Sequence, residues 1–136
     1  MRDIQSEMKE FWGHSCYAWC LAKLFLGTDN IYNMMGHILF AWESGYIDND
    51  GFVSKPLKFI GTMSKEPRDI QKVKINKIED IPNEPTIVEM SCPIGGSHFV
   101  ICHYDGKKVI LDFDPSGNSN SWKAQKFISW RKYLYD

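Results

Sequence analysis

The apolar positions at the start of the chain recur with the period of a helix. Ile4, Met8 and Phe11 fall three to four residues apart, with charged residues between them. This spacing predicts an amphipathic helix over residues 3–11 that buries one face. Gly13 follows as a natural end for that helix, because glycine is a poor helix former.

Three further helices are predicted in the same half. Ser15 stands before an apolar stretch, so it is the expected N-cap of a helix over residues 16–26. That stretch is apolar on nearly all sides, which is typical of a helix at the centre of a core. A third helix is expected over residues 31–43 and a short fourth one over residues 56–61.

The pattern changes in the second half to the alternation and β-branched runs typical of strands. Strands are predicted over residues 70–75, 86–90, 98–104 and 107–113, and one or two more over residues 124–135. A run of helices followed by antiparallel strands predicts an α+β domain. Its N-terminal helices would pack on one face of a twisted antiparallel sheet.

The predicted strands over residues 98–104 and 107–113 form the hairpin on which the candidate chemistry depends. Asp105 and Gly106 separate them, and Asp-Gly between β-branched runs is typical of a two-residue hairpin turn. A turn of that length would pair Tyr104 with Lys107.

Counting outward from this turn places His98 opposite Phe113, beside Asp114. An imidazole next to a carboxylate is the arrangement of a general base and the group that orients it. Asp112 is an alternative orienting residue, because it lies on the same strand face two positions earlier. Asp114 is better placed in the predicted register.

Cys16 is the candidate third member of this set. It follows a Gly-His-Ser break and enters an apolar helix, so its thiol would lie at a helix N-terminus. Exposed N–H groups and the helix dipole at that position favour the thiolate. The alternative is a buried structural thiol, as expected of Cys20 and Cys102 on the apolar faces of their elements.

Composition narrows the classes of function. The chain has 136 residues, which suits a single domain, and its formal net charge of -1 arises from interspersed charges. Such a sequence offers no cluster of basic residues that would bind nucleic acid. The longest apolar run is interrupted by Lys23 and is too short to span a membrane. Four cysteines without an apolar leader segment favour reduced thiols in the cytoplasm.

Two metal sites are conceivable but poorly supported. Cys16, Cys20, His98 and Cys102 could hold zinc, although the chain has no Cys-x-x-Cys pair among them. Residues 48–51 resemble the start of a calcium loop, but no acidic residue follows at the spacing of a bidentate ligand. A turn is the preferred interpretation of that segment, and neither a metal nor a cofactor is expected.

Taken in order, these residues resemble the motifs of the papain-like cysteine peptidases. Ser15-Cys16-Tyr17 enters a helix near the N-terminus, Ser97-His98-Phe99-Val100 opens a strand, and Asp114-Pro115 closes the next one. The closest subgroup is the compact bacterial type that cleaves double-glycine leader peptides. The set GHSCY, GYID, SHF and DPSGNS is also similar to short proteins carried by phages and plasmids.

The resemblance covers most of the chain and implies a single papain-like domain over residues 1–136. It implies a cysteine hydrolase that acts on a peptide or protein substrate. In the family pattern Cys16 would be the nucleophile, and its backbone N–H would donate to the oxyanion. His98 would be the general base and then the general acid, and Asp114 would fix the imidazole tautomer.

One position departs from the family pattern. Papain-like enzymes carry a glutamine six residues before the cysteine as a second oxyanion donor, and Glu10 stands there in this chain. An ionised carboxylate accepts hydrogen bonds and repels a developing oxyanion. Gln5, Trp12 or His14 could supply the donor instead. The departure motivates a second hypothesis, a papain-like fold that acts as a binding module.

Overall fold

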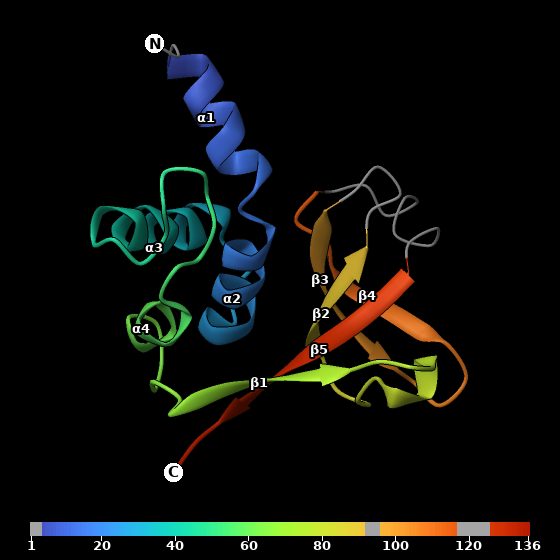
Figure 1. The fold of residues 1–136 in the computed structure, drawn as a ribbon. Coiled ribbons are helices and arrows are strands. Elements are labelled where there is room, and N and C mark those ends of the chain that lie inside the picture. Colours follow the sequence, from blue (N-terminus) through green and yellow to red (C-terminus); the bar gives the residue numbers. More distant parts are fainter. Residues whose placement is uncertain (1–3, 92–95, 117–125) are drawn as a thin grey trace. The chain divides into compact units, whose positions relative to one another are not determined.

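The computed structural model describes residues 4–91, 96–116 and 126–136 (Figure 1). These residues divide into two compact units. The helical unit comprises the described residues up to Asp69, together with Tyr135–Asp136, and the sheet unit comprises Ile70–Leu134. Helices therefore lie in the first half of the chain and strands in the second, which confirms the predicted α+β class.

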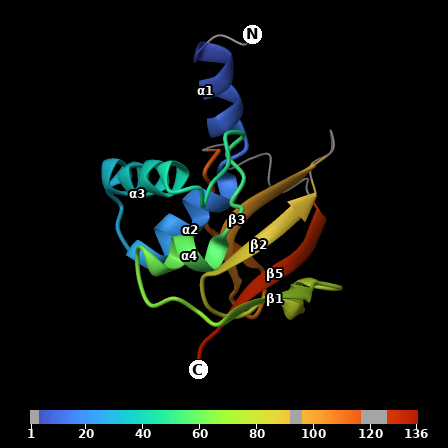
Figure 2. The ribbon, with the colours of Figure 1, turned by 60° about the vertical axis from the view of Figure 1, so that its left-hand side comes forward.

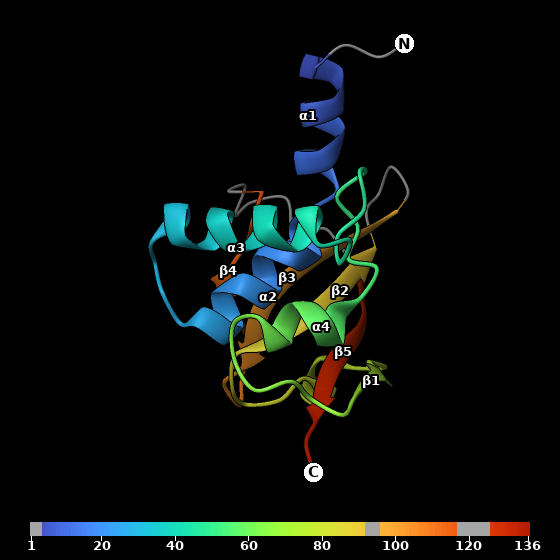
Figure 3. The ribbon, with the colours of Figure 1, turned by 90° about the vertical axis from the view of Figure 1, so that its left-hand side faces the viewer.

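The helical unit contains α1 (Ile4–Gly13), α2 (Cys16–Leu26), α3 (Ile31–Glu43) and α4 (Pro56–Gly61). All four helices begin and end within about two residues of the predicted positions. α2 packs against α3 and α4 (Figure 3). It buries Ala18, Cys20, Leu21 and Ala22, which confirms that the most apolar helix is a central one.

The starts of α3 and α2 are stabilised in different ways. The side chain of Asn30 caps α3 by accepting hydrogen bonds from the N–H groups of Tyr32 and Asn33. Ser15 occupies the same position before α2, but its hydroxyl donates to the carbonyl of Trp12 at 2.9 Å. Ser15 is the N-cap residue of α2, as predicted, but its side chain makes no capping hydrogen bond. Its backbone, at φ -96° and ψ 15°, lies outside the extended region typical of capping residues.

The sheet unit holds five strands in the order β1-β5-β2-β3-β4. Figure 2 shows β2 with β5 on one side of it and β3 on the other. The elements are β1 (Asp69–Lys74), a short 3-10 helix η1 (Ile78–Asp80), β2 (Thr86–Ser91), β3 (Ser97–Tyr104), β4 (Val109–Phe113) and β5 (Lys126–Leu134). β2 pairs antiparallel with β3 and with β5, and β3 pairs antiparallel with β4. The predicted antiparallel sheet is confirmed, and its last segment is one strand.

One face of this sheet carries an apolar core. Val88 and Met90 of β2 meet Val100 and Cys102 of β3 there, with Ile75 and Ile81 beside them. Side chains alternate along a strand, so His98 belongs to the same face as Val100 and Cys102. The candidate base therefore stands at the end of a buried row.

The turn between β3 and β4 is wider than predicted. Tyr104 pairs with Val109, which leaves a four-residue loop. The Asp105 carboxylate organises this loop by accepting hydrogen bonds from the N–H groups of Lys107 and Lys108, both at 2.8 Å. The predicted pairing of Tyr104 with Lys107 is therefore wrong. The Asp105 side chain stabilises a four-residue loop in place of the expected two-residue turn.

The strand register farther along the hairpin also differs from the predicted one, because the loop is wider and because β4 contains a bulge. Phe113 pairs with Ile101, and the pairing skips Asp112, the extra residue of a bulge in β4. The predicted pairing of His98 with Phe113 is therefore wrong. The partner of Phe113 is Ile101, which lies three residues closer to the turn than His98. Asp114 begins the segment that leaves the sheet.

Candidate functional site

His98 and Asp114 form a hydrogen-bonded pair in the sheet unit despite the altered register. Nε2 of His98 lies 2.8 Å from Oδ1 of Asp114, and both side chains are largely buried. Because a carboxylate can only accept, the proton of the neutral imidazole belongs to Nε2. His98 is thus held in the tautomer whose Nδ1 carries a lone pair and can accept a proton.

The carboxylate of Asp114 is itself held in place. Its Oδ1 also accepts from the N–H of Ser116 at 2.9 Å and from the Ser116 hydroxyl at 2.7 Å. Oδ2 is buried and has no hydrogen-bond partner among the residues that the structure describes. A buried carboxylate oxygen without a donor is uncommon in native proteins and calls for an explanation, such as a catalytic role.

Asp112, the alternative orienting residue, serves a different histidine. Its Oδ2 lies 2.8 Å from Nδ1 of His103, in a pair that is more exposed than the first. The hairpin therefore carries two imidazole–carboxylate pairs. Asp114 is the partner of His98, as the sequence favoured.

Cys16 is the first residue of α2 and lies in the helical unit. Its side chain is half-buried, whereas Cys20 and Cys102 are fully buried. Cys16 therefore differs from the two cysteines to which a structural role was assigned. Burial, together with the nearby charge of Asp112, raises the pKa of Cys102 to about 12.

The loop that follows the GYID motif, residues 49–52, packs against the junction between α1 and α2. Gly51 packs so closely that an added Cβ would lie 2.0 Å from the carbonyl oxygen of Phe11. Nδ1 of His14 lies 3.2 Å from the carbonyl oxygen of Asp50, and the His14 ring stacks on Phe52 at 4.9 Å between centroids. The segment that leads into the candidate nucleophile is thereby fixed by contacts that the motif spacing alone did not reveal.

Glu10 and the candidate oxyanion donors lie on α1 or directly after it. Glu10 lies near the end of α1 and is half-buried. Gln5 lies in the first turn, about 12 Å along the helix axis from Gly13, which makes it a poor candidate. His14 uses Nδ1 for the contact with the loop, so Nε2 is the nitrogen left to donate or accept elsewhere.

Sequence reasoning assigned no role to Glu89, although four strands meet at its side chain. Oε2 accepts from the hydroxyl of Ser97 at 2.8 Å, and Oε1 accepts from that of Ser129 at 3.0 Å. Arg131 and Lys72 each place a nitrogen 3.3 Å from Oε1. The only signal in the sequence was a charged residue inside an otherwise apolar strand.

This network sets the ionisation of Glu89. Burial alone would raise the pKa of the carboxyl group, but hydrogen bonds from Ser97, Ser129 and Lys72 and the charge of Arg131 outweigh burial and lower the pKa from 4.5 to about 2. Ser97 directly precedes the candidate base, so the ionised carboxylate fixes the start of β3.

Comparisons of the chain with protein-family models, with curated proteins and with solved structures gave no match. Among the helices of the described ranges, none combines the length and the hydropathy that crossing a bilayer requires.

Proposed function

We propose that this chain is a papain-like cysteine hydrolase that acts on a peptide or another amide or ester. Cys16 would be the nucleophile, His98 the general base and then the general acid, and Asp114 the group that orients His98. The proposal requires the sulfur of Cys16 to approach Nδ1 of His98 during the reaction.

The observation that carries the proposal is the tautomer imposed on His98. Asp114 binds Nε2 at 2.8 Å and is braced by Ser116, so the lone pair on Nδ1 is directed by contacts within the sheet unit. The His103–Asp112 pair has the same 2.8 Å spacing but is more exposed, so it is the burial of the His98–Asp114 pair and the support of Asp114 by Ser116 that favour a proton acceptor at His98. The α+β architecture and the motif order are compatible with this assignment.

The reaction would proceed in two steps. Nδ1 of His98 takes the thiol proton, and the thiolate forms a bond to the substrate carbonyl carbon. The bond from that carbon to the leaving nitrogen or oxygen breaks, and His98 returns the proton to the leaving group. A water molecule, deprotonated by His98, then attacks the thioester, releases the acid and restores the thiol of Cys16.

A second candidate function is a binding module with the same architecture. Glu10 favours it, because a carboxylate at the position of an oxyanion donor would cost about 10²–10³ in rate. The two candidates differ in the reactivity expected of Cys16, which can be measured without knowing a substrate.

The test is alkylation of Cys16 by iodoacetamide across pH, followed by mass spectrometry. An activated thiol should react well below the ordinary cysteine pKa of about 8.5. His98→Ala should abolish that reactivity, and Asp114→Asn should reduce it strongly because Asn permits the wrong tautomer. Asp112→Asn is the matched control and should have little effect.

A disulfide test asks directly whether the two residues meet. In a His98→Cys variant, mild oxidation should join the new thiol to Cys16, since a disulfide needs Cβ atoms about 3.5–4.5 Å apart. His103→Cys serves as the control. An ordinary alkylation profile unaffected by His98→Ala, or no disulfide to Cys16 in the His98→Cys variant, would favour the binding module.

A further inference from the structure

A second candidate site, independent of the proposed chemistry, lies in the helical unit. A groove of about 740 Å³ runs between α1 and α3. Its walls are the apolar faces of both helices, represented by Ile4, Met8 and Trp12 on one side and Met35, Leu39 and Trp42 on the other. The α1 residues follow the spacing by which one helix presents a stripe to another.

The walls of this groove expose an unusual amount of apolar surface. The exposed fractions are 75% for Ile4, 55% for Met8, 42% for Leu39 and 44% for Trp42. α1 has ten residues, and Phe11 is its buried one. Helices of this length are marginal in water unless their apolar face is packed against something. The exposed stripe of α1 is therefore suited to an occupant that completes its packing.

Contacts with neighbouring residues hold one aromatic ring of the groove wall in place. The indole N–H of Trp42 donates to Oδ1 of Asn49 at 2.9 Å, which fixes the ring. The Phe11 ring meets the Trp42 ring edge-on, at 6.4 Å between centroids. Aromatic side chains fixed before binding lose little conformational entropy when a partner arrives, so they are effective anchors.

Charge around the groove specifies the partner. Glu7 lines the groove, and Glu10, Glu43, Asp48 and Asp50 each stand next in sequence to a residue that lines it. Among the described neighbours of the lining residues, Lys9 is the one basic side chain. The surroundings are thus acidic, and a cationic partner would be attracted while an anionic one would be repelled.

We propose that this groove docks an amphipathic helix of a partner protein, with apolar residues at the i, i+3/i+4 and i+7 positions and Lys or Arg on its flanks. The stripe from Ile4 to Trp12 is about 12 Å long, which matches two turns of such a helix. A second copy of this chain is a poor occupant, because a self-complementary contact would bring two acidic surfaces together.

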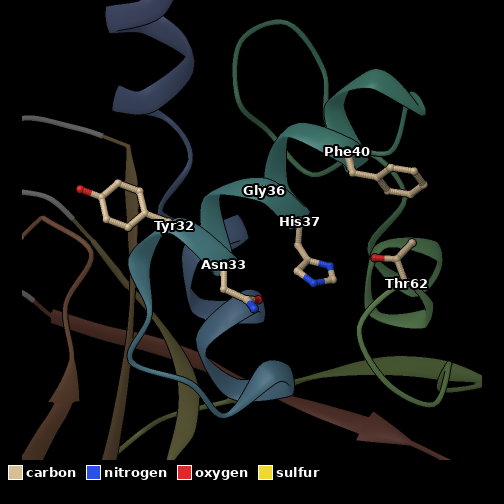
Figure 4. Close-up of a pocket in the computed structure, with 6 residues that line it drawn as sticks. All are labelled: Tyr32, Asn33, Gly36, His37, Phe40 and Thr62. Carbon is tan, nitrogen blue, oxygen red and sulfur yellow. The ribbon is translucent and has the colours of Figure 1, made fainter.

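A hollow elsewhere on α3 supplies a matched control. It measures about 470 Å³ and is lined by Tyr32, Asn33, Gly36, His37, Phe40 and Thr62 (Figure 4). Phe40 is 55% exposed and follows Leu39 directly, but it does not line the α1–α3 groove. Removing it therefore changes apolar exposure on the same helix without touching the groove.

The test uses a fluorescent synthetic helix of about 18 residues, roughly five turns, with leucine at the helical period and lysine elsewhere. Binding to the full chain is followed by fluorescence anisotropy at low salt. Met8→Ala and Leu39→Ala should each weaken binding about tenfold or more. Phe40→Ala should leave the dissociation constant within about twofold, and a peptide with glutamate in place of lysine should bind about tenfold more weakly.

Hydrogen exchange on the unmodified chain keeps the proposal testable if a variant does not fold. Addition of the lysine peptide should protect the amides of α1 and α3 and leave those of α4 unchanged. Equal binding by the groove variants, equal binding by the glutamate peptide, or protection absent from α1 would overturn the proposal. So would self-association of the chain that Met8→Ala abolishes, because the occupant would then be a second copy.

Discussion

Replacing Glu89 by Gln should remove a defined part of the acid sensitivity of the sheet unit. The pKa of Glu89 falls from 4.5 to about 2 on folding, which corresponds to about 3 kcal/mol at about 1.36 kcal/mol per pH unit. Because the folded pKa is depressed, this stabilisation is fully present above about pH 4.5 and is lost as the pH falls toward 2. Between those values the unfolded chain binds the proton and the folded chain does not.

The assay is urea denaturation of the native chain and the Glu89→Gln variant, followed by far-ultraviolet circular dichroism. The difference in unfolding free energy should be about 3 kcal/mol larger near pH 6 than near pH 2. Glu84→Gln, at an exposed position outside these contacts, is the control variant. A difference for Glu89→Gln that stays constant from pH 6 to pH 2 would show that the contacts with Ser97, Ser129, Lys72 and Arg131 do not depress the pKa.

Three further outcomes are expected. Gly51→Ala should lower the melting temperature, with a loss of about 1–3 kcal/mol, because the new Cβ would lie 2.0 Å from the Phe11 carbonyl oxygen at a φ of +93°; an unchanged melting temperature would refute the close approach. Asn30→Ala removes the cap of α3 and should cost about 1 kcal/mol in urea denaturation. Cys102, whose pKa is raised to about 12, should resist iodoacetamide near pH 9 in the native chain and react once urea unfolds it; labelling of the native chain would contradict its burial.

The helices were predictable because their signals are local. The apolar period of α1, the glycine at its end and Asn30 before α3 all act within a few residues of the elements they define. The hydrogen bond of the Ser15 side chain was not predictable, for the opposite reason. Its hydroxyl is used by the carbonyl of Trp12, a contact set by the turn between α1 and α2.

The hairpin register was not predictable from the turn residues. The Asp105 side chain widens the loop and Asp112 adds a bulge, and both effects depend on the folded geometry. The pairing of His98 with Asp114 was nevertheless predicted correctly. After β4 the chain brings Asp114 back to His98, and Ser116 holds the Asp114 carboxylate there. The contact therefore forms although the strand register differs from the predicted one by three residues.

The Glu89 network lay beyond sequence reasoning altogether. Its partners come from three other strands, and the nearest of them in sequence, Ser97, is eight residues away. Patterns along the chain reveal which faces are apolar, but they do not show which charges meet across a sheet. Such contacts become visible only when the strand order is known.

That strand order also constrains how the sheet can assemble. β5 is the last strand in the chain, yet it lies between β1 and β2, and through it Arg131 meets Glu89 from 42 residues away. β2, β3 and β4 are neighbours both in the chain and in the sheet, so their pairing closes the shorter loops and is expected first. β1 must then wait for β5, its one neighbour in the described sheet. During synthesis the hairpin that carries His98 and Asp114 would form while β1 was still unpaired, and the sheet would close only after Leu134 had been added.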